Sequence, residues 1–124
     1  MHRFTLLSAV LLCLAVPAAA QPPAAGPTTQ ILTTLTVKTD VDRAEIMKVL
    51  PDEVRATVKL YLDGKIQQWY SRSDGRGVIF ILNATSVADA KALTDQLPLS
   101  KANLATFEYT ALSPLGPLRL LMQP

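Results

Sequence analysis

The pattern of apolar and polar positions divides the chain into short strand-like and helix-like segments. Residues 31–38 are rich in β-branched side chains and predict a strand. Asp40 or Asp42 then caps a helical stretch that runs to about Leu50. A proline inside a helix costs about 3 kcal/mol, so we expect a break or kink at Pro51, with a new helix starting there.

The helix expected after this proline is amphipathic. Its apolar side chains recur at i, i+4, i+7 and i+8 and form one stripe, made of Val54, Val58, Tyr61 and Leu62. Gly64 follows this stripe, and a glycine is the natural residue to end a helix.

Two strands joined by a tight turn are predicted next. Residues 66–72 form the first strand, which carries Trp69 and Tyr70. The sequence Asp-Gly-Arg-Gly at residues 74–77 is a turn signal. Residues 78–82 are wholly apolar, as expected of a central strand that is buried on both faces. The two strands therefore form a hairpin.

A second helix and a last strand complete the pattern. Ser86, with Asp89 three residues later, resembles a capping box and starts a helix that ends at Pro98. One side of this helix carries Ala90, Leu93 and Leu97. Residues 104–112 alternate loosely and predict a strand with Phe107, Tyr109 and Ala111 on one face. An apolar tail follows at residues 118–122.

The resulting order, strand-helix-strand-strand-helix-strand, predicts a ferredoxin-like α+β fold. Two right-handed crossovers around a central hairpin give one antiparallel four-stranded sheet with two helices on one face. The other face would then be uncovered, although the strands carry apolar residues on both sides. We expect a second copy of the chain to cover it, giving a homodimer or a larger assembly. The apolar C-terminal tail is the alternative cover.

The N-terminus predicts export of the protein. A basic start at residues 1–3, a short apolar stretch and small residues at 18–20 are typical of a cleavable secretory signal peptide at residues 1–20. The apolar stretch is shorter than the roughly 20 residues that a membrane-spanning helix needs. Residues 21–29, rich in proline and small side chains, predict a flexible linker before the domain at 30–124. We therefore expect a periplasmic or secreted protein that does not bind membranes after cleavage.

The amino-acid composition excludes several kinds of metal site and catalysis. Cleavage would remove Cys13 and His2, the single cysteine and the single histidine of the chain. A zinc or haem site with histidine or cysteine ligands, and nucleophilic catalysis that uses either residue, are thereby excluded, and we expect no cofactor and no metal. The 12 basic and 10 acidic residues nearly balance, which gives no electrostatic reason to expect nucleic acid as a partner.

An ordered set of features resembles the muconolactone isomerase-like family of dimeric α+β barrels. The set comprises Asp63-Gly64-Lys65-Ile66-Gln67-Gln68-Trp69, the hairpin, the apolar strand, the second helix and Leu97-Pro98-Leu99, within a match over about residues 30–115. The resemblance implies isomerisation of a small unsaturated lactone by proton movement without a cofactor, in dimers whose sheets face each other. The family's histidine, four residues after the glycine, corresponds to Gln68, which cannot exchange a proton near neutral pH.

Such chemistry needs a general base and a donor to the developing enolate. The possible bases are Glu53, Asp74 and, as a weak candidate for the catalytic residue, Glu108. Glu53 is also suited simply to the N-terminus of the helix that we expect from Pro51 onward.

The candidate ligand contacts are Gln68, Tyr70, Arg72 and Tyr61. Strand alternation places the first three on one face and Trp69, a core or dimer-interface residue, on the other. A cationic, aromatic strand face could hold a small carboxylate, with Arg72 as its anion contact. The same residues could equally pack, be solvated or lie at an interface.

Two functional hypotheses remain open. The first is a cofactor-free isomerase-like enzyme, or a degenerate form that binds a small organic acid or lactone. The second is a non-catalytic periplasmic module for assembly or ligand binding. The absence of the histidine favours the second hypothesis, and the resemblance favours the first.

Overall fold

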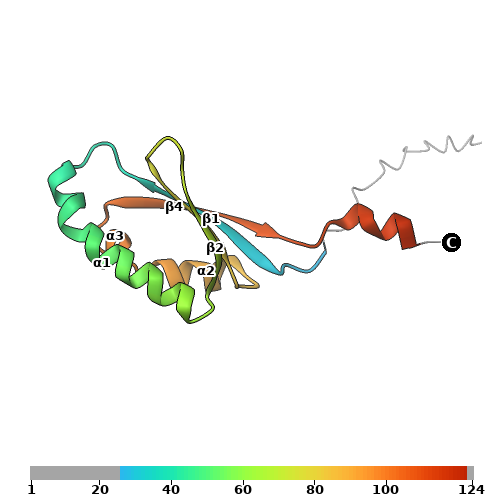
Figure 1. The fold of residues 1–124 in the computed structure, drawn as a ribbon. Coiled ribbons are helices and arrows are strands. Elements are labelled where there is room, and N and C mark those ends of the chain that lie inside the picture. Colours follow the sequence, from blue (N-terminus) through green and yellow to red (C-terminus); the bar gives the residue numbers. More distant parts are fainter. Residues whose placement is uncertain (1–25, 123–124) are drawn as a thin grey trace, which may run out of the picture.

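Four antiparallel strands form one sheet in the order β2-β3-β1-β4, and the helices α1, α2 and α3 lie on one of its faces (Figure 1). The structure is a computed structural model that describes residues 26–122. Its elements are β1 (Gln30–Val37), α1 (Arg43–Leu62), β2 (Ile66–Ser71), β3 (Gly77–Leu82), α2 (Val87–Thr94), α3 (Pro98–Lys101), β4 (Ala105–Leu112) and the 3-10 helix η1 (Gly116–Met122). The strand order and the helices on one face confirm the predicted ferredoxin-like fold class.

Helix α1 corrects the prediction of a break at Pro51, because it is one continuous helix of 20 residues. Asp42 is the residue that caps it, and its Oδ1 accepts a hydrogen bond from the Ala44 N–H at 2.9 Å. Pro51 has no N–H to donate to the Met47 carbonyl, but both residues are exposed, so water can reach that carbonyl. Packing of α1 against the sheet and α3 offsets the remaining penalty.

The apolar stripe expected to mark the inner face of α1 lies mostly outside. Val54, Val58, Tyr61 and Leu62 are all exposed, and Leu62 retains 77% of its accessible surface. The inner face is instead formed by Ile46, Val49, Glu53, Thr57 and Leu60, of which Glu53 and Thr57 are the most deeply buried. Two polar residues among the inward positions made this face hard to identify from hydrophobicity alone.

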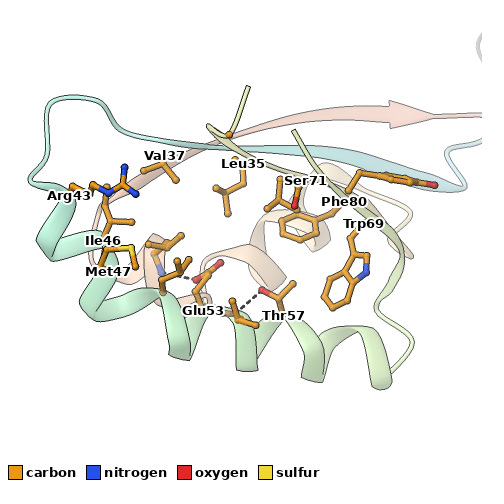
Figure 2. A pocket seen from close by; sticks show the side chains of 17 residues that line it. Leu35, Val37, Arg43, Ile46, Met47, Glu53, Thr57, Trp69, Ser71 and Phe80 are labelled. Atoms are coloured by element: carbon orange, nitrogen blue, oxygen red, sulfur yellow. Dashed lines mark hydrogen bonds between the residues drawn. The ribbon is translucent and has the colours of Figure 1, made fainter. Parts of the chain in front are cut away.

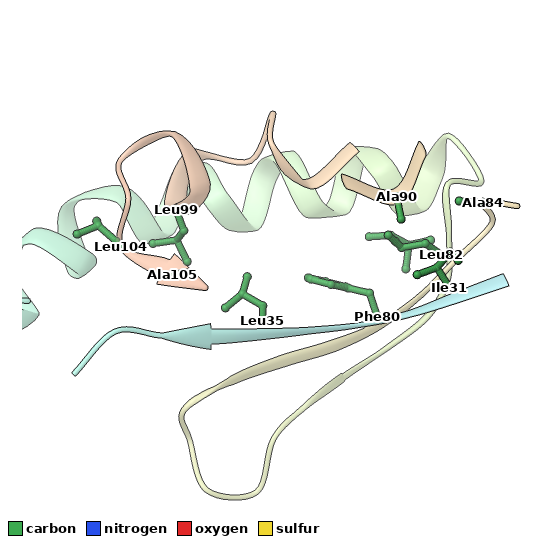
Figure 3. Close-up of a cluster of buried hydrophobic side chains, with 10 residues drawn as sticks. Ile31, Leu35, Phe80, Leu82, Ala84, Ala90, Leu99, Leu104 and Ala105 are labelled. Atoms are coloured by element: carbon green, nitrogen blue, oxygen red, sulfur yellow. The ribbon is translucent and has the colours of Figure 1, made fainter. Parts of the chain in front are cut away.

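The hydrophobic core lies between the sheet and the helices (Figure 3). Phe80 and Leu82 of β3 and Ile31 and Leu35 of β1 point into it and are almost completely buried. Ile79 and Ile81 alternate to the other side of β3 and stay half-buried. The predicted burial of β3 on both faces is therefore not realised within one chain, because one layer of helices covers only one face.

The second predicted helix is divided into two. Its start is confirmed, since the Asp89 N–H donates to Ser86 Oγ at 3.1 Å. However, α2 already ends at Thr94, and Pro98 is the first residue of the separate helix α3. Proline fits a first helical turn, where its missing N–H would have no partner in the helix.

The C-terminal tail does not cover the open sheet face, which corrects that alternative. After β4 the chain runs past the end of the sheet, and η1 projects away from the body of the domain (Figure 1). The large apolar side chains of this segment are exposed, namely Leu115, Leu118, Leu120, Leu121 and Met122.

The predicted signal peptide lies outside the described residues, as does the linker up to residue 25. At the end of the linker, the Thr29 N–H donates to the Leu112 carbonyl at 2.8 Å and extends the pairing of β1 with β4. Among the helices of residues 26–122, none combines the length and the apolar character needed to cross a membrane.

Candidate functional site

A pocket of about 590 Å³ lies between α1 and the sheet (Figure 2). Its α1 wall includes Arg43, Ile46, Leu50, Glu53 and Thr57. Its opposite wall includes Leu35, Val37, Trp69, Ser71 and Phe80 of the sheet. Most of these side chains are apolar, so the few polar groups define what the pocket can bind. A concave apolar site with a small number of convergent polar groups is typical of small-molecule binding.

Glu53 is the acidic residue that lines this pocket. Its side chain projects from the middle of α1 and is only 5% exposed. The Leu99 N–H donates to its Oε2 at 2.8 Å, whereas its Oε1 has no hydrogen-bond partner among the described residues (Figure 2). A buried carboxyl oxygen without a partner is costly, because it has lost its hydration without compensation. Such an oxygen is expected where a ligand supplies the missing contact.

The environment of Glu53 also changes its acidity. Burial raises the pKa of its carboxyl, because removal from water disfavours the charged form, and the Leu99 hydrogen bond opposes this effect only in part. The net result is a pKa above the ordinary glutamate value. A carboxyl whose pKa is raised holds a proton more readily than an ordinary glutamate does, which suits it to return a proton as well as to accept one.

Aromatic side chains form one end of the pocket. Trp69 points from β2 toward α1 and stacks on Tyr61, with ring centroids 5.0 Å apart and an interplanar angle of 11°. Tyr61, a predicted ligand contact, thus supports the tryptophan from the outside. Thr57 does not donate a hydrogen bond to the Glu53 carboxyl, because its hydroxyl donates instead to the Glu53 backbone carbonyl at 2.7 Å.

Three of the predicted ligand contacts lie on the open face of the sheet. Gln68, Tyr70 and Arg72 project away from the side on which Trp69 faces the helices, as strand alternation predicts. Tyr70 borders the pocket, but its hydroxyl donates to Gln68 Oε1 at 3.2 Å. Their shared face is therefore confirmed, and of the three residues Tyr70 borders the pocket, whereas Gln68 and Arg72 do not line it.

The predicted anion contact, Arg72, already has partners within the chain. Its guanidinium donates to Thr36 Oγ1 at 2.8 Å and forms an ion pair with Asp74. The Arg76 N–H, and to a lesser extent Arg72, hold the pKa of Asp74 below its ordinary value. Asp74 therefore remains ionised and supports the hairpin turn.

Glu108 lies on β4, at the edge of the sheet opposite to β2. It pairs with Thr34 of β1, so β1 and β3 separate it from the β2 candidates. Three interstrand spacings amount to about 14 Å, and one small ligand would not readily contact both edges. The structure thus separates Glu108 from the β2 candidates, which share one sheet face.

Glu53 was a possible base on sequence grounds, but its place in the pocket was not predicted. The expected break at Pro51 put Glu53 in the first turn of a new helix, where an acidic residue is unremarkable. In a continuous helix, Ile46, Val49, Glu53 and Leu60 share one face. A carboxyl inside an apolar helix face was the signal that could have identified the site.

Residues 26–122 contain no cluster of three or more histidine, cysteine, aspartate or glutamate side chains that could hold a metal ion. The chemistry available within the described residues therefore depends on the Glu53 carboxyl and on the hydrogen-bond donors around it.

Comparison with known proteins supports the fold. No protein-family model matches the chain, and no characterised protein sequence matches it significantly. Among solved structures, the chain is similar to the crystal structure of muconolactone isomerase, with a TM-score of 0.58 and 18% sequence identity. The match covers 70% of this chain and 91% of that one. The resemblance to the muconolactone isomerase-like fold is thereby confirmed, and at this level of identity it establishes the fold alone.

Proposed function

We propose that this domain binds a small organic molecule in the pocket between α1 and the sheet, and that Glu53 is the acid–base group of a cofactor-independent, isomerase-like reaction. The observation that carries the proposal is the Oε1 oxygen of Glu53, which is buried at an apolar pocket and has no partner among the described residues. The similarity to muconolactone isomerase is consistent with this choice, because that protein is named as an isomerase.

The proposed reaction moves one proton within the substrate. Ionised Glu53 removes a proton from a carbon next to a carbonyl, which leaves an enolate and a protonated Glu53. The same carboxyl then returns the proton to another carbon of the conjugated system, and the double bond shifts. No oxidant, reductant or second substrate is needed. Ser71 lines the pocket, and its hydroxyl is the proposed donor to the enolate oxygen.

This reaction does not need a histidine in β2. Gln68 occupies the position where the family resemblance implies histidine, and it lies on the open face. A carboxyl whose pKa is raised by burial can instead serve as both acid and base. Glu53 would therefore take the proton-transfer role from the other side of the strand.

Hydrogen–deuterium exchange of a substrate analogue tests the proposal. The protein is incubated in D₂O with a β,γ-unsaturated lactone or an unsaturated cyclic ketone, and NMR follows deuterium incorporation and double-bond migration. Glu53→Gln is expected to slow both processes about 100-fold or more, whereas Glu108→Gln leaves them unchanged. Binding in both variants is followed by fluorescence of Trp69, the single tryptophan of the chain. Equal exchange by wild type and Glu53→Gln would exclude Glu53 as the base.

A second function, self-assembly, is favoured by the open sheet face. Leu32, Ile79 and Ile81 lie half-buried on this face, and no helix within residues 26–122 covers it. We propose that two copies pack these faces together in an exported protein. Export is proposed from the signal-like residues 1–20. Assembly without turnover would correspond to the non-catalytic hypothesis.

A further inference from the structure

The α1 residues that line the pocket change from cationic to apolar to acidic along the helix. Arg43 lies at one end of the pocket, Ile46 and Leu50 follow along the helix, and Glu53 comes after them (Figure 2). We propose that the pocket binds an elongated amphipathic carboxylate. Its carboxylate head binds Arg43, and its hydrocarbon part lies along Ile46 and Leu50. A hydroxyl or carbonyl group at its other end forms a hydrogen bond with Glu53 Oε1. This inference rests on the pocket of the proposed function and names the class of its ligand.

Arg43 is the basic residue that lines the described pocket. It takes part in none of the ion pairs formed between residues 26 and 122. The other cations of α1 are engaged: Lys48 pairs with Glu45 at 2.7 Å, Arg55 with Asp52 at 2.8 Å, and Lys59 with Asp63 at 2.6 Å. The guanidinium of Arg43 is thus the group on this helix suited to receive an anion from the pocket, and its planar fork matches a carboxylate.

The spacing of the two polar groups sets the length of the ligand. Arg43 and Glu53 are ten positions apart on one helix, which separates their Cα atoms by about 15 Å. Both residues border the same pocket, and its lining also includes the apolar residues Leu35 and Val37 of β1 and Ile46 and Leu50 of α1. A compact acid would reach only one of the two groups. A longer molecule with an apolar middle can contact both.

Charge determines the orientation of the ligand. The carboxylate head is disfavoured beside Glu53, because burying a second negative group next to a carboxyl is costly. The Oε1 oxygen can instead accept a hydrogen bond from a hydroxyl when Glu53 is ionised, or donate one to a carbonyl when it is protonated. The expected ligand is therefore charged at the Arg43 end and neutral but polar at the Glu53 end.

The test measures binding of a defined series of probes to the full chain by Trp69 fluorescence and calorimetry. The probes are decanoic acid, its methyl ester, and the ω-hydroxy acid of the same length, with butyric acid as the short control. Wild type is expected to bind decanoic acid roughly fivefold more tightly than the ester, and butyric acid much more weakly. The ω-hydroxy acid should bind roughly another fivefold more tightly than decanoic acid.

Two variants assign these preferences to residues. Arg43→Gln should abolish the preference for acid over ester and leave ester binding unchanged, while Arg55→Gln, on the outer side of α1, should alter neither. Glu53→Gln should reduce the preference for the hydroxy acid over the plain acid. Circular dichroism establishes that each variant is folded.

Equal binding of acid and ester by wild type, or equal losses in Arg43→Gln and Arg55→Gln, would overturn the proposed ligand class while leaving small-molecule binding in place. An isomerisation that depends on Glu53 but proceeds only with compact substrates would likewise reject the ligand class and retain the proposed reaction. Absence of binding by every probe would overturn the inference directly.

Discussion

Glu53 joins two helices that are distant in sequence, because its Oε2 accepts the hydrogen bond of the Leu99 N–H at 2.8 Å. Leu99 is in the first turn of α3, and Leu97, the residue at the N-cap position of that helix, provides no side-chain acceptor. Glu53 therefore fulfils the capping function from α1. One oxygen of this carboxyl positions the side chain, and the other is buried without a hydrogen-bond partner among the described residues.

The first prediction concerns this cap. Glu53→Ala leaves the buried Leu99 N–H without its partner and opens space in the pocket wall, so we expect a loss of about 1–3 kcal/mol in the free energy of unfolding. Glu53→Gln retains an acceptor oxygen and should keep most of the stability. Urea denaturation of the two variants measures the difference, and an alanine variant as stable as the glutamine variant would contradict the capping role.

The second prediction concerns pH. The pKa of Glu53 is raised in the folded protein, so the folded state binds this proton more tightly than the unfolded state does. Its contribution to stability is full below the unfolded pKa and is lost as pH rises through the raised folded pKa. Glu53→Gln cannot titrate. We therefore expect the stability of Glu53→Gln relative to wild type to increase with pH across this window and then level off. Thermal denaturation at a series of pH values measures it, and a difference independent of pH would refute the assignment.

A third prediction distinguishes two glycines of the hairpin. A Cβ at Gly77 would lie 1.9 Å from the Leu35 carbonyl oxygen, so Gly77→Ala must displace β3 from β1, and we expect a loss of more than about 3 kcal/mol. A Cβ at Gly75 meets no atom within 4 Å, and only its positive φ of 68° opposes a side chain. Gly75→Ala should therefore cost about 1 kcal/mol. Denaturation curves that reverse this order would contradict the close approach of the two strands.

A fourth prediction concerns assembly. Ile79, like Ile81, faces away from the helices, whereas its neighbour Phe80 belongs to the core. Ile79→Asp should convert the proposed dimer into monomers with low solubility, because a charge in an apolar interface is not compensated. Val87→Asp, on the exposed side of α2, serves as the matched control and should leave assembly unchanged. Light scattering measures the oligomeric state of each protein, and a wild-type monomer at micromolar concentration would exclude the dimer.

The last prediction concerns processing. The small residues Ala18 and Ala20 satisfy the pattern before a signal-peptide cleavage site, so the exported protein should begin at Gln21. Intact-mass spectrometry of the secreted or periplasmic protein measures this, and a mass that still includes Cys13 would contradict cleavage.

Local sequence signals were sufficient to predict most of the fold. The Asp42 and Ser86 caps, the turn at residues 74–77 and the alternation around Trp69 each depend on neighbouring residues, and the structure contains all of them. Pro51 was misinterpreted because the intrinsic penalty for proline within a helix can be offset by tertiary packing, which a local pattern does not contain.

The site was harder to predict for the same reason. The partner of Glu53 is the backbone of Leu99, 46 positions away, and no sequence spacing indicates such a contact. Arg72 looked available in the sequence, but the structure brings Thr36 and Asp74 to its guanidinium. Both sets of contacts arise only in the folded chain, and a local sequence pattern does not contain them.

The position of β1 in the sheet has a consequence for the rate of folding. This strand begins the domain, yet it pairs with β4, which ends it, so that Ile31 lies opposite Ala111 and Val37 opposite Ala105. Closing such a long loop costs entropy before any of these contacts form. High contact order slows folding, and the central strand stays incomplete until the last strand has been synthesised. The complete four-stranded sheet can therefore form only after β4 has been synthesised.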